Sequence, residues 1–405
     1  MNTDILLHLL LALAAVIALG QVLARALALV GQPPVIGEVA AGLLLGPSII
    51  GPALSARILP PEVAPFLGLV AQLGVILYMF IIGLDLHLDD VKDRAHVTLA
   101  TSVAGIIVPF GLGWALALFL YPRVAPPGVP FTTFALFMGV AMSVTAFPVL
   151  ARLLADWGLT RTEVGVLALS AAAFDDAIAW CLLALVVGVA HAEPGDAVRV
   201  GIGAVVYLAV MLFIARPLLQ RYVLRWKASS PYAVAAVLVA LLLSAAATEA
   251  IGLHAIFGAF LLGAIVPRDS DVARALGRQM RDLVTILMLP AFFAFTGMRT
   301  RIDLLSSGSD WMLCALITAV ATVGKFAGAF GAARLSGMRA RQAAMVGALM
   351  NTRGLMELIV LNVGLELGVI SPELFAMMVL MALATTMSTA PMLKALGGGK
   401  VQSGT

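Results

Sequence analysis

The chain has 405 residues and a formal net charge of +3; 62% of the residues are hydrophobic and only 12% are charged. Soluble domains carry about 25% charged residues, so this composition excludes a soluble globular protein and predicts a polytopic helical membrane protein. The positive charge does not indicate nucleic-acid binding, because the basic residues gather in the connections between apolar blocks, as the positive-inside rule describes.

Apolar blocks of about 20 residues, long enough to cross a bilayer as a helix, recur along the chain. They predict thirteen membrane spans, of which the second and ninth are short and flanked by Gly and Pro. In chain order, the predicted spans are 4–29, 33–50, 63–84, 96–120, 130–154, 162–190, 198–222, 231–251, 254–267, 281–298, 311–333, 342–364 and 373–394.

The basic residues indicate the orientation of these spans. With the N-terminus outside, eighteen of the 25 Lys and Arg residues fall in cytoplasmic connections or in the tail. Because cytoplasmic loops carry the excess of Lys and Arg, we expect an outer N-terminus and a cytoplasmic C-terminus. The basic residues left on the outer side are Arg57, Arg123, Arg199, Arg299 and Arg301.

The connections are short, and only a polar, Gly-rich tail, 396–405, follows the last span. We therefore expect a single transmembrane transporter domain, 1–395, with no enzymatic activity, no cofactor and no soluble nucleotide-binding domain.

Two adjacent acids, Asp175 and Asp176, lie in the middle of the predicted span 162–190. A charge near the bilayer centre costs about 2.5–3.5 kcal/mol on insertion scales, so such residues are functional candidates. Neighbours on a helix point about 100° apart, which places the two acids in different surroundings. Lys325, in the eleventh predicted span, is the natural partner for one of them.

Arg353 and Glu357, in the twelfth predicted span, are a second buried pair. Their i, i+4 spacing places both on one face of a helix. A functional role and a purely structural ion pair are both open for them, because desolvation can cancel the gain from a buried pair.

Two predicted spans contain interruptions. In the fifth, Pro148 follows Ser143, Val144 and Thr145, and a proline frees carbonyls in the preceding turn. The pattern predicts either unwinding at "TAFP" or a simple kink. In the twelfth, "NTRG", residues 351–354, places four poor membrane-helix residues in mid-span.

The interrupted spans run in opposite directions through the membrane, which is the relation expected of an inverted repeat. Spans two to six, about 33–190, would then match spans nine to thirteen, about 254–394, with 198–251 as linking helices. Paired interruptions in two halves point to a transporter's binding site.

Five motifs together resemble the monovalent cation:proton antiporter superfamily, in the branch of Kef-type bacterial exchangers and plant cation/proton exchangers. They occur in order over most of the chain. They are QPPVIGEVAAGLLLGPSIIGP (32–52), FIIGLDLHL (80–88), TAFPVLAR (145–152), the DD pair (175–176) and MNTRGLMELIVLNVG (350–364).

The resemblance implies an NhaA-like fold of about thirteen helices, in which the fifth and twelfth are discontinuous and cross. It also implies a homodimer in the bacterial inner membrane. Asp176 matches the acid that binds cation and proton in turn, and Asp175 matches the acid that pairs with Lys325. Members with DD tend to be electrogenic. Kef-type systems carry a large cytoplasmic regulatory domain, which this sequence lacks, so regulation of that kind is in doubt.

The expected function is a secondary active antiporter that exchanges Na+, K+ or both for protons by alternating access and contributes to pH homeostasis. Asp176 would hold the cation or the proton, and backbone oxygens near Val144 and Thr145, the Thr145 hydroxyl and Asp175 would complete the cation site. The residues expected to support the crossing of the broken helices are Pro148, Asn351, Thr352, Arg353 and Glu357.

Three other functions are considered. A monovalent cation channel or regulated leak also uses broken helices and buried carboxylates. A bile-acid-type sodium symporter would have fewer spans and no DD pair with a lysine. A purely structural or sensor protein does not explain three intramembrane charges beside two helix breaks.

Overall fold

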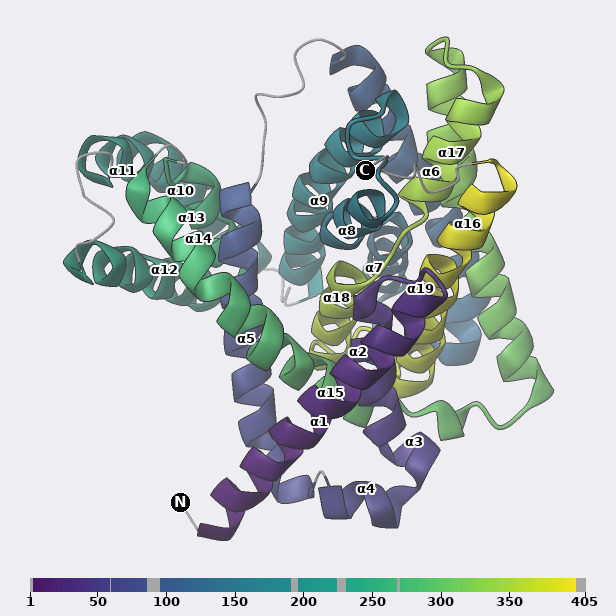
Figure 1. Cartoon of the computed structure of the whole chain (residues 1–405), viewed down its shortest axis with the longest axis horizontal. Helices are drawn as coiled ribbons and strands as arrows, with labels where there is room; N and C mark the ends of the chain where they lie inside the picture. Colours follow the sequence, from purple (N-terminus) through teal and green to yellow (C-terminus); the bar gives the residue numbers. More distant parts are fainter. Residues whose placement is uncertain are drawn as a thin grey trace. The chain divides into compact units, whose positions relative to one another are not determined.

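The computed structural model describes residues 3–58, 60–85, 95–190, 196–223, 231–267 and 270–397. Within these ranges the protein is all-helical, with 87% helix and no strand (Figure 1). Some residues used in the sequence predictions lie outside the described ranges. They are the basic residues Lys92, Arg94, Arg225, Lys227, Arg268 and Lys400, the last three residues of the 80–88 motif, and the tail from residue 398 onward.

Ten helical segments of the described chain are long and apolar enough to cross a membrane, and one bent helix pair raises the number to eleven. The helices α2 (Pro34–Leu45) and α13 (Ala255–Ile265), at the predicted second and ninth spans, are apolar but shorter. The protein is therefore a multi-pass membrane protein.

The chain divides into two compact units, and the division falls within the helices α1 (Thr3–Leu29), α9 (Glu163–Ala190) and α15 (Leu289–Arg299) and at the last residue of α4 (Pro52–Ile58). The first unit contains α5 (Ala64–Asp85), α10 (Asp196–Val210), α11 (Arg216–Val223), α12 (Pro231–Ile251), α13 and α14 (Asp271–Leu283). The second contains α2, α3 (Pro47–Ile50), most of α4, α6 (Ala95–Val124), α7 (Phe131–Ser143), α8 (Phe147–Asp156), α16 (Gly308–Leu335), α17 (Ala340–Met350), α18 (Leu355–Glu366) and α19 (Pro372–Ala395).

In the first unit, α5 packs against α13 through glycines. A Cβ atom on Gly263 would collide with the carbonyl oxygen of Phe80, and one on Gly83 with the carbonyl oxygen of Phe260. Since only hydrogen occupies these positions, the two backbones approach closely, as small residues allow in membrane helix pairs.

In the second unit, α16 packs along α6, and α6 also contacts α7. A Cβ atom on Gly328 of α16 would lie 2.5 Å from the carbonyl oxygen of Ala104 on α6. This close approach brings Lys325, one turn before Gly328 on α16, against the backbone of α6.

Both predicted interruptions are breaks in helical structure. Residues 144–146 are non-helical between α7 and α8, and Pro148 stands in the first turn of α8, where its missing N–H is not needed. Residues 351–354 separate α17 from α18, and these two helices are bent by 43°. The break at "TAFP" is therefore an unwound segment rather than a simple kink.

The helical segment at the predicted tenth span extends beyond the predicted bounds 281–298 and covers Asp271–Leu304. Its start, α14, is a charged amphipathic helix, and the Ser270 hydroxyl caps it by accepting from the Ala273 N–H at 3.1 Å. Hydropathy does not detect this part, because α14 has charged residues on one face.

Candidate functional site

The two adjacent acids lie on α9, and both are buried. Asp175 is 0% exposed and Asp176 is 2% exposed. Consecutive helical positions direct the two side chains differently, and their surroundings differ accordingly.

The Asp175 carboxylate has three partners from three different segments. Its Oδ1 accepts from the Ser102 hydroxyl of α6 at 2.7 Å. Its Oδ2 accepts from the Thr145 hydroxyl at 2.8 Å and from Lys325 Nζ, also at 2.8 Å. Both oxygens of Asp175 are thus paired, and one of them belongs to a buried ion pair.

Lys325 donates all three of its ammonium protons. Besides Asp175, its Nζ donates to the carbonyl oxygens of Gly105 on α6 at 2.8 Å and of Ser143 on α7 at 2.6 Å. An ammonium group has three donors and no acceptor, so its hydrogen-bonding capacity is complete. This arrangement keeps a charged lysine stable at 0% exposure.

Asp176 has the opposite character. Within the described chain, neither of its carboxylate oxygens has a hydrogen-bond partner, although both are buried. The charges of Asp175 and Lys325 and the backbone N–H of Phe147, at the start of α8, act on it electrostatically. A buried charge without a partner is expensive, so this carboxylate is suited to take up a proton or a cation.

Arg353 contacts the end of α7 from the other broken helix. Its Nη1 donates to the Ala141 carbonyl oxygen and to Glu357 Oε2, each at 2.8 Å, and its Nη2 donates to the Met142 carbonyl oxygen at 2.5 Å. The Arg353–Glu357 ion pair is fully buried. The predicted i, i+4 pair therefore forms and also links the two interrupted helices.

The two breaks also touch through their backbones. The Ala146 N–H donates to the Thr352 carbonyl oxygen at 3.0 Å. On the other side of the second break, the Thr386 hydroxyl of α19 accepts from the Arg353 N–H at 3.0 Å and donates to the Arg353 carbonyl oxygen at 2.7 Å. Unwound backbone at this depth is thus paired within protein, as a bilayer requires.

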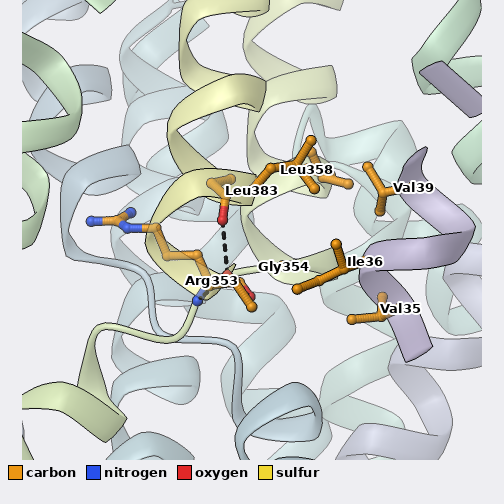
Figure 2. A pocket seen from close by; sticks show the side chains of 9 residues that line it. Val35, Ile36, Val39, Arg353, Gly354, Leu358 and Leu383 are labelled. Carbon is orange, nitrogen blue, oxygen red and sulfur yellow. Dashed lines mark hydrogen bonds between the residues drawn. The ribbon is translucent and has the colours of Figure 1, made fainter. Parts of the chain in front are cut away.

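A small cavity lies behind the second break, between α2, α18 and α19. Its volume is about 10 Å³, space for about one water molecule. Figure 2 shows Val35, Ile36 and Val39 of α2 facing Leu358 and Leu383, while the guanidinium group of Arg353 points away. The lining is mostly apolar, and the hydroxyl of Thr386, which also lines the cavity, is hydrogen-bonded to the backbone of Arg353 and Ala382.

The structure brings Asp175, Asp176, Thr145 and Lys325 together, as the sequence predicted. The Thr145 hydroxyl donates to Asp175, and Val144, beside it in the unwound segment, is 1% exposed. The hydroxyl of Thr352 lies 3.4 Å from that of Thr389 on α19.

Several further polar residues lie at or near the breaks and helix ends, among them Asn351, which was expected to support the crossing. Asn351 is fully buried, and in the described structure its side-chain amide has no hydrogen-bond partner. Sequence reasoning missed Ser102 and Gly105, because small residues are common in any membrane helix. Glu249 caps α13, since its Oε2 accepts from the Ala255 N–H at 2.7 Å.

Known transport proteins are similar to this chain over most of its length. A family model described as "Sodium/hydrogen exchanger, transmembrane" matches residues 11–395. The Na(+)/H(+) antiporter NhaS4 of Synechocystis sp. is 42% identical over 401 residues, which cover 97% of this chain and 98% of that protein. The K(+)/H(+) antiporter 1 of Saccharomyces cerevisiae is 36% identical over 89% of this chain, but over only 43% of its own length.

A solved structure shares the fold. The sodium proton antiporter MjNhaP1 from Methanocaldococcus jannaschii matches with a TM-score of 0.70 over 98% of this chain and 100% of that chain, at 14% sequence identity. This likeness extends over nearly the whole chain and concerns the fold.

Proposed function

This chain belongs to the sodium/hydrogen exchanger family, and we propose on that premise that it exchanges a monovalent cation, Na+ or K+, for protons. The observation that carries the proposal is the Asp176 carboxylate, which is buried and without a hydrogen-bond partner in the described chain, beside two broken helices. One carboxylate can bind a proton or a cation but not both. This competition couples the two fluxes.

The cation would be held by Asp176 with oxygens of the unwound segment, namely backbone oxygens near Val144 and Thr145 and the Thr145 hydroxyl. Asp175 lies next to this site and can add a carboxylate oxygen. When the cation leaves, a proton neutralises Asp176, and the neutral site crosses the low-dielectric barrier. This is alternating access with one shared binding residue.

The Asp175–Lys325 pair would set the number of charges that move. A partner lysine that releases its proton during the cycle makes exchange electrogenic, and each charge crossing the membrane is then worth about 2.3 kcal/mol per 100 mV. The 2.8 Å ion pair supports this role, because it places Lys325 beside the exchanging acid.

We further propose that α2 and α13 complete thirteen spans in two inverted repeats, 33–190 and 254–394, joined by linking helices 198–251. The contact between the two breaks supports their crossing at the centre of the repeats. The resemblance adds a homodimer in a bacterial inner membrane, with the N-terminus outside and the C-terminus, including the tail 396–405, in the cytoplasm.

Exchange is favoured over a channel or leak, because NhaS4, the yeast relative and MjNhaP1 are all named as antiporters. The two functions differ in a measurable way. An antiporter moves protons against their gradient when a cation gradient is supplied, whereas a channel only dissipates the cation gradient.

The decisive variant is Asp176→Asn, which keeps the size of the side chain and removes its charge. In proteoliposomes with a pH-sensitive dye, we expect the wild type to move protons when Na+ or K+ is added and Asp176→Asn to move none. Asp271→Asn, at an acid in the exposed first turn of α14, is the matched control and should leave exchange intact. Cation-driven proton movement by Asp176→Asn would refute the assignment.

A further inference from the structure

Buried polar atoms without a partner are concentrated at the two helix breaks. In the described chain, most of the buried side-chain nitrogen and oxygen atoms without a partner belong to five residues. Asp176, Asn351, Arg353 and Glu357 lie at or around the breaks, and Thr101 lies on α6. Buried polar groups in native proteins are normally paired, so such a concentration indicates a place for water or an ion.

Asn351 is the neutral member of this group with the most unused capacity. It follows the last residue of α17, its side chain is 0% exposed, and both atoms of its amide lack a partner in the described structure. An amide oxygen has two lone pairs and an amide nitrogen has two protons. A fully buried Asn with none of these used is poorly explained by a structural role.

The position of Asn351 brings it near Asp176. The next residue, Thr352, accepts a hydrogen bond from the Ala146 N–H at 3.0 Å. The residue after Ala146 is Phe147, whose N–H acts on the Asp176 carboxylate. Because neighbouring Cα atoms are only about 3.8 Å apart, this short chain of contacts keeps Asn351 within a few residue lengths of the exchanging acid.

We propose that Asn351 is a ligand of the transported cation, with its amide oxygen in the coordination shell beside Asp176. This inference rests on the proposed function and deepens it. Hard cations take oxygen ligands, and carbonyl oxygens suit them well. Since the amide is neutral, it adds a ligand without a second negative charge, and one proton still suffices to neutralise the empty site.

The other side chains near the breaks do not supply the same kind of ligand. The Thr145 hydroxyl donates its proton to Asp175, and its oxygen is already part of the proposed cation site. Lys325 and the guanidinium of Arg353 are cations and cannot coordinate another. The amide oxygen of Asn351 is therefore the neutral carbonyl-type side-chain ligand that the second broken helix contributes.

Asn362 provides a matched control, because it is a buried Asn on α18 whose amide is fully engaged. Its Nδ2 donates to the Thr296 hydroxyl at 3.0 Å and to the Leu358 carbonyl oxygen at 2.9 Å, and its Oδ1 accepts from Arg299 at 3.3 Å. Truncation of Asn362 removes structural hydrogen bonds, whereas truncation of Asn351 removes none in the described structure.

The test measures the melting temperature of the purified full chain in Na+, K+ or choline at constant ionic strength and alkaline pH. A cation that binds only the folded protein raises its melting temperature. For Asn351→Ala we expect unchanged or higher stability in choline. We also expect an apparent cation affinity about tenfold or more weaker, because the cation loses one oxygen ligand and such a contact to a charged group contributes that much. Asn351→Asp keeps an oxygen in place and should retain cation stabilisation.

Asn362→Ala should melt at a lower temperature in choline and retain the wild-type cation affinity. If Asn351→Ala behaves like Asn362→Ala, Asn351 is a structural residue and the ligand assignment is refuted while the proposed function stands. If the wild type itself gives no cation-dependent shift and no exchange, the proposed function fails, and the ligand assignment fails with it.

Discussion

At the scale of single residues, the two acids of α9 differ in how completely they are paired. Asp175 receives two hydroxyl donors and the Lys325 ammonium group, and Lys325 in turn uses its remaining protons on two carbonyl oxygens. Asp176 has no such partner within the described chain. The paired acid is suited to hold a charge in place, and the unpaired acid is suited to exchange ions.

Removal of Lys325 should have two effects. Lys325→Ala leaves Asp175 buried without a cation and two carbonyl oxygens without a donor, so we expect a loss of about 3–5 kcal/mol in stability, as for a broken buried ion pair. We also expect smaller currents on a solid-supported membrane after a cation jump. Melting curves and current recordings on the same preparation check both effects.

The double variant Asp175→Asn with Lys325→Ala is the control for this prediction. It removes the uncompensated charge and should recover part of the lost stability without restoring the current. A single variant with wild-type stability and current would contradict the role of the pair.

At the scale of elements, α7 ends inside the protein with all its terminal carbonyl oxygens paired. The last four carbonyls of a helix have no partner within the helix. Here the Ser143 hydroxyl donates to Val140, Arg353 donates to Ala141 and Met142, and Lys325 donates to Ser143. Two cations therefore stand at the negative end of the helix dipole, where positive charge is stabilising.

The close approach of α7 and α18 can be tested at Gly364. A Cβ atom on Gly364 of α18 would collide with the ring of Phe137 on α7, which is fully buried. Gly364→Ala should therefore lower stability by about 1–3 kcal/mol through overpacking. It should also slow exchange, since the broken helices shift. Melting curves and proteoliposome transport measure the two effects.

Two further variants make this prediction specific. Phe137→Leu combined with Gly364→Ala relieves the collision and should recover most of the stability. Gly111→Ala, at an exposed position of α6 with no neighbour within 4 Å, should leave exchange unchanged and should not lower stability, because Ala is the better helix former. Failure of the double variant to recover would show that the collision is not the cause.

At the scale of the whole molecule, an antiporter has to couple ion binding on one side of the membrane to ion release on the other. The chain divides into two compact units, and the described residues of the site, from α6, α7, the two breaks, α9 and α16, belong to one of them. The candidate ion site and the two backbone breaks thus belong to a single unit, which also contains the Asp175–Lys325 pair.

The proposed competition between cation and proton at Asp176 predicts a defined pH dependence of transport. Below the pKa of the exchanging carboxyl, the proton occupies the site and the cation must displace it. The apparent KM for the cation should therefore rise about tenfold for each unit of pH decrease in that range, while the maximal rate stays constant. Initial rates in proteoliposomes at several pH values, with saturating and limiting Na+ or K+, measure this dependence. A constant KM with a falling maximal rate would exclude simple competition.

The sequence by itself indicated most of the apolar segments, the positions of two helix interruptions and the charged residues that are buried. These properties are local, because the insertion cost of a charge and the missing N–H of Pro148 act within a helical turn or two. Asp175, Asp176 and Lys325 could be selected on that basis. The start of the tenth helical segment, α14, was missed because a charged amphipathic helix has no hydropathy signal.

Only the tertiary structure decided which partner each buried polar group has. The donors and acceptors around Asp175 and Lys325 include the Ser102 hydroxyl and the backbone oxygens of Gly105 and Ser143. Backbone oxygens are the same for every residue type, and small residues along α6 and α16 determine which of them Lys325 can reach. Pairing within the folded bundle therefore distinguishes the saturated Asp175 from the unpaired Asp176 and Asn351, whereas the residue types alone do not.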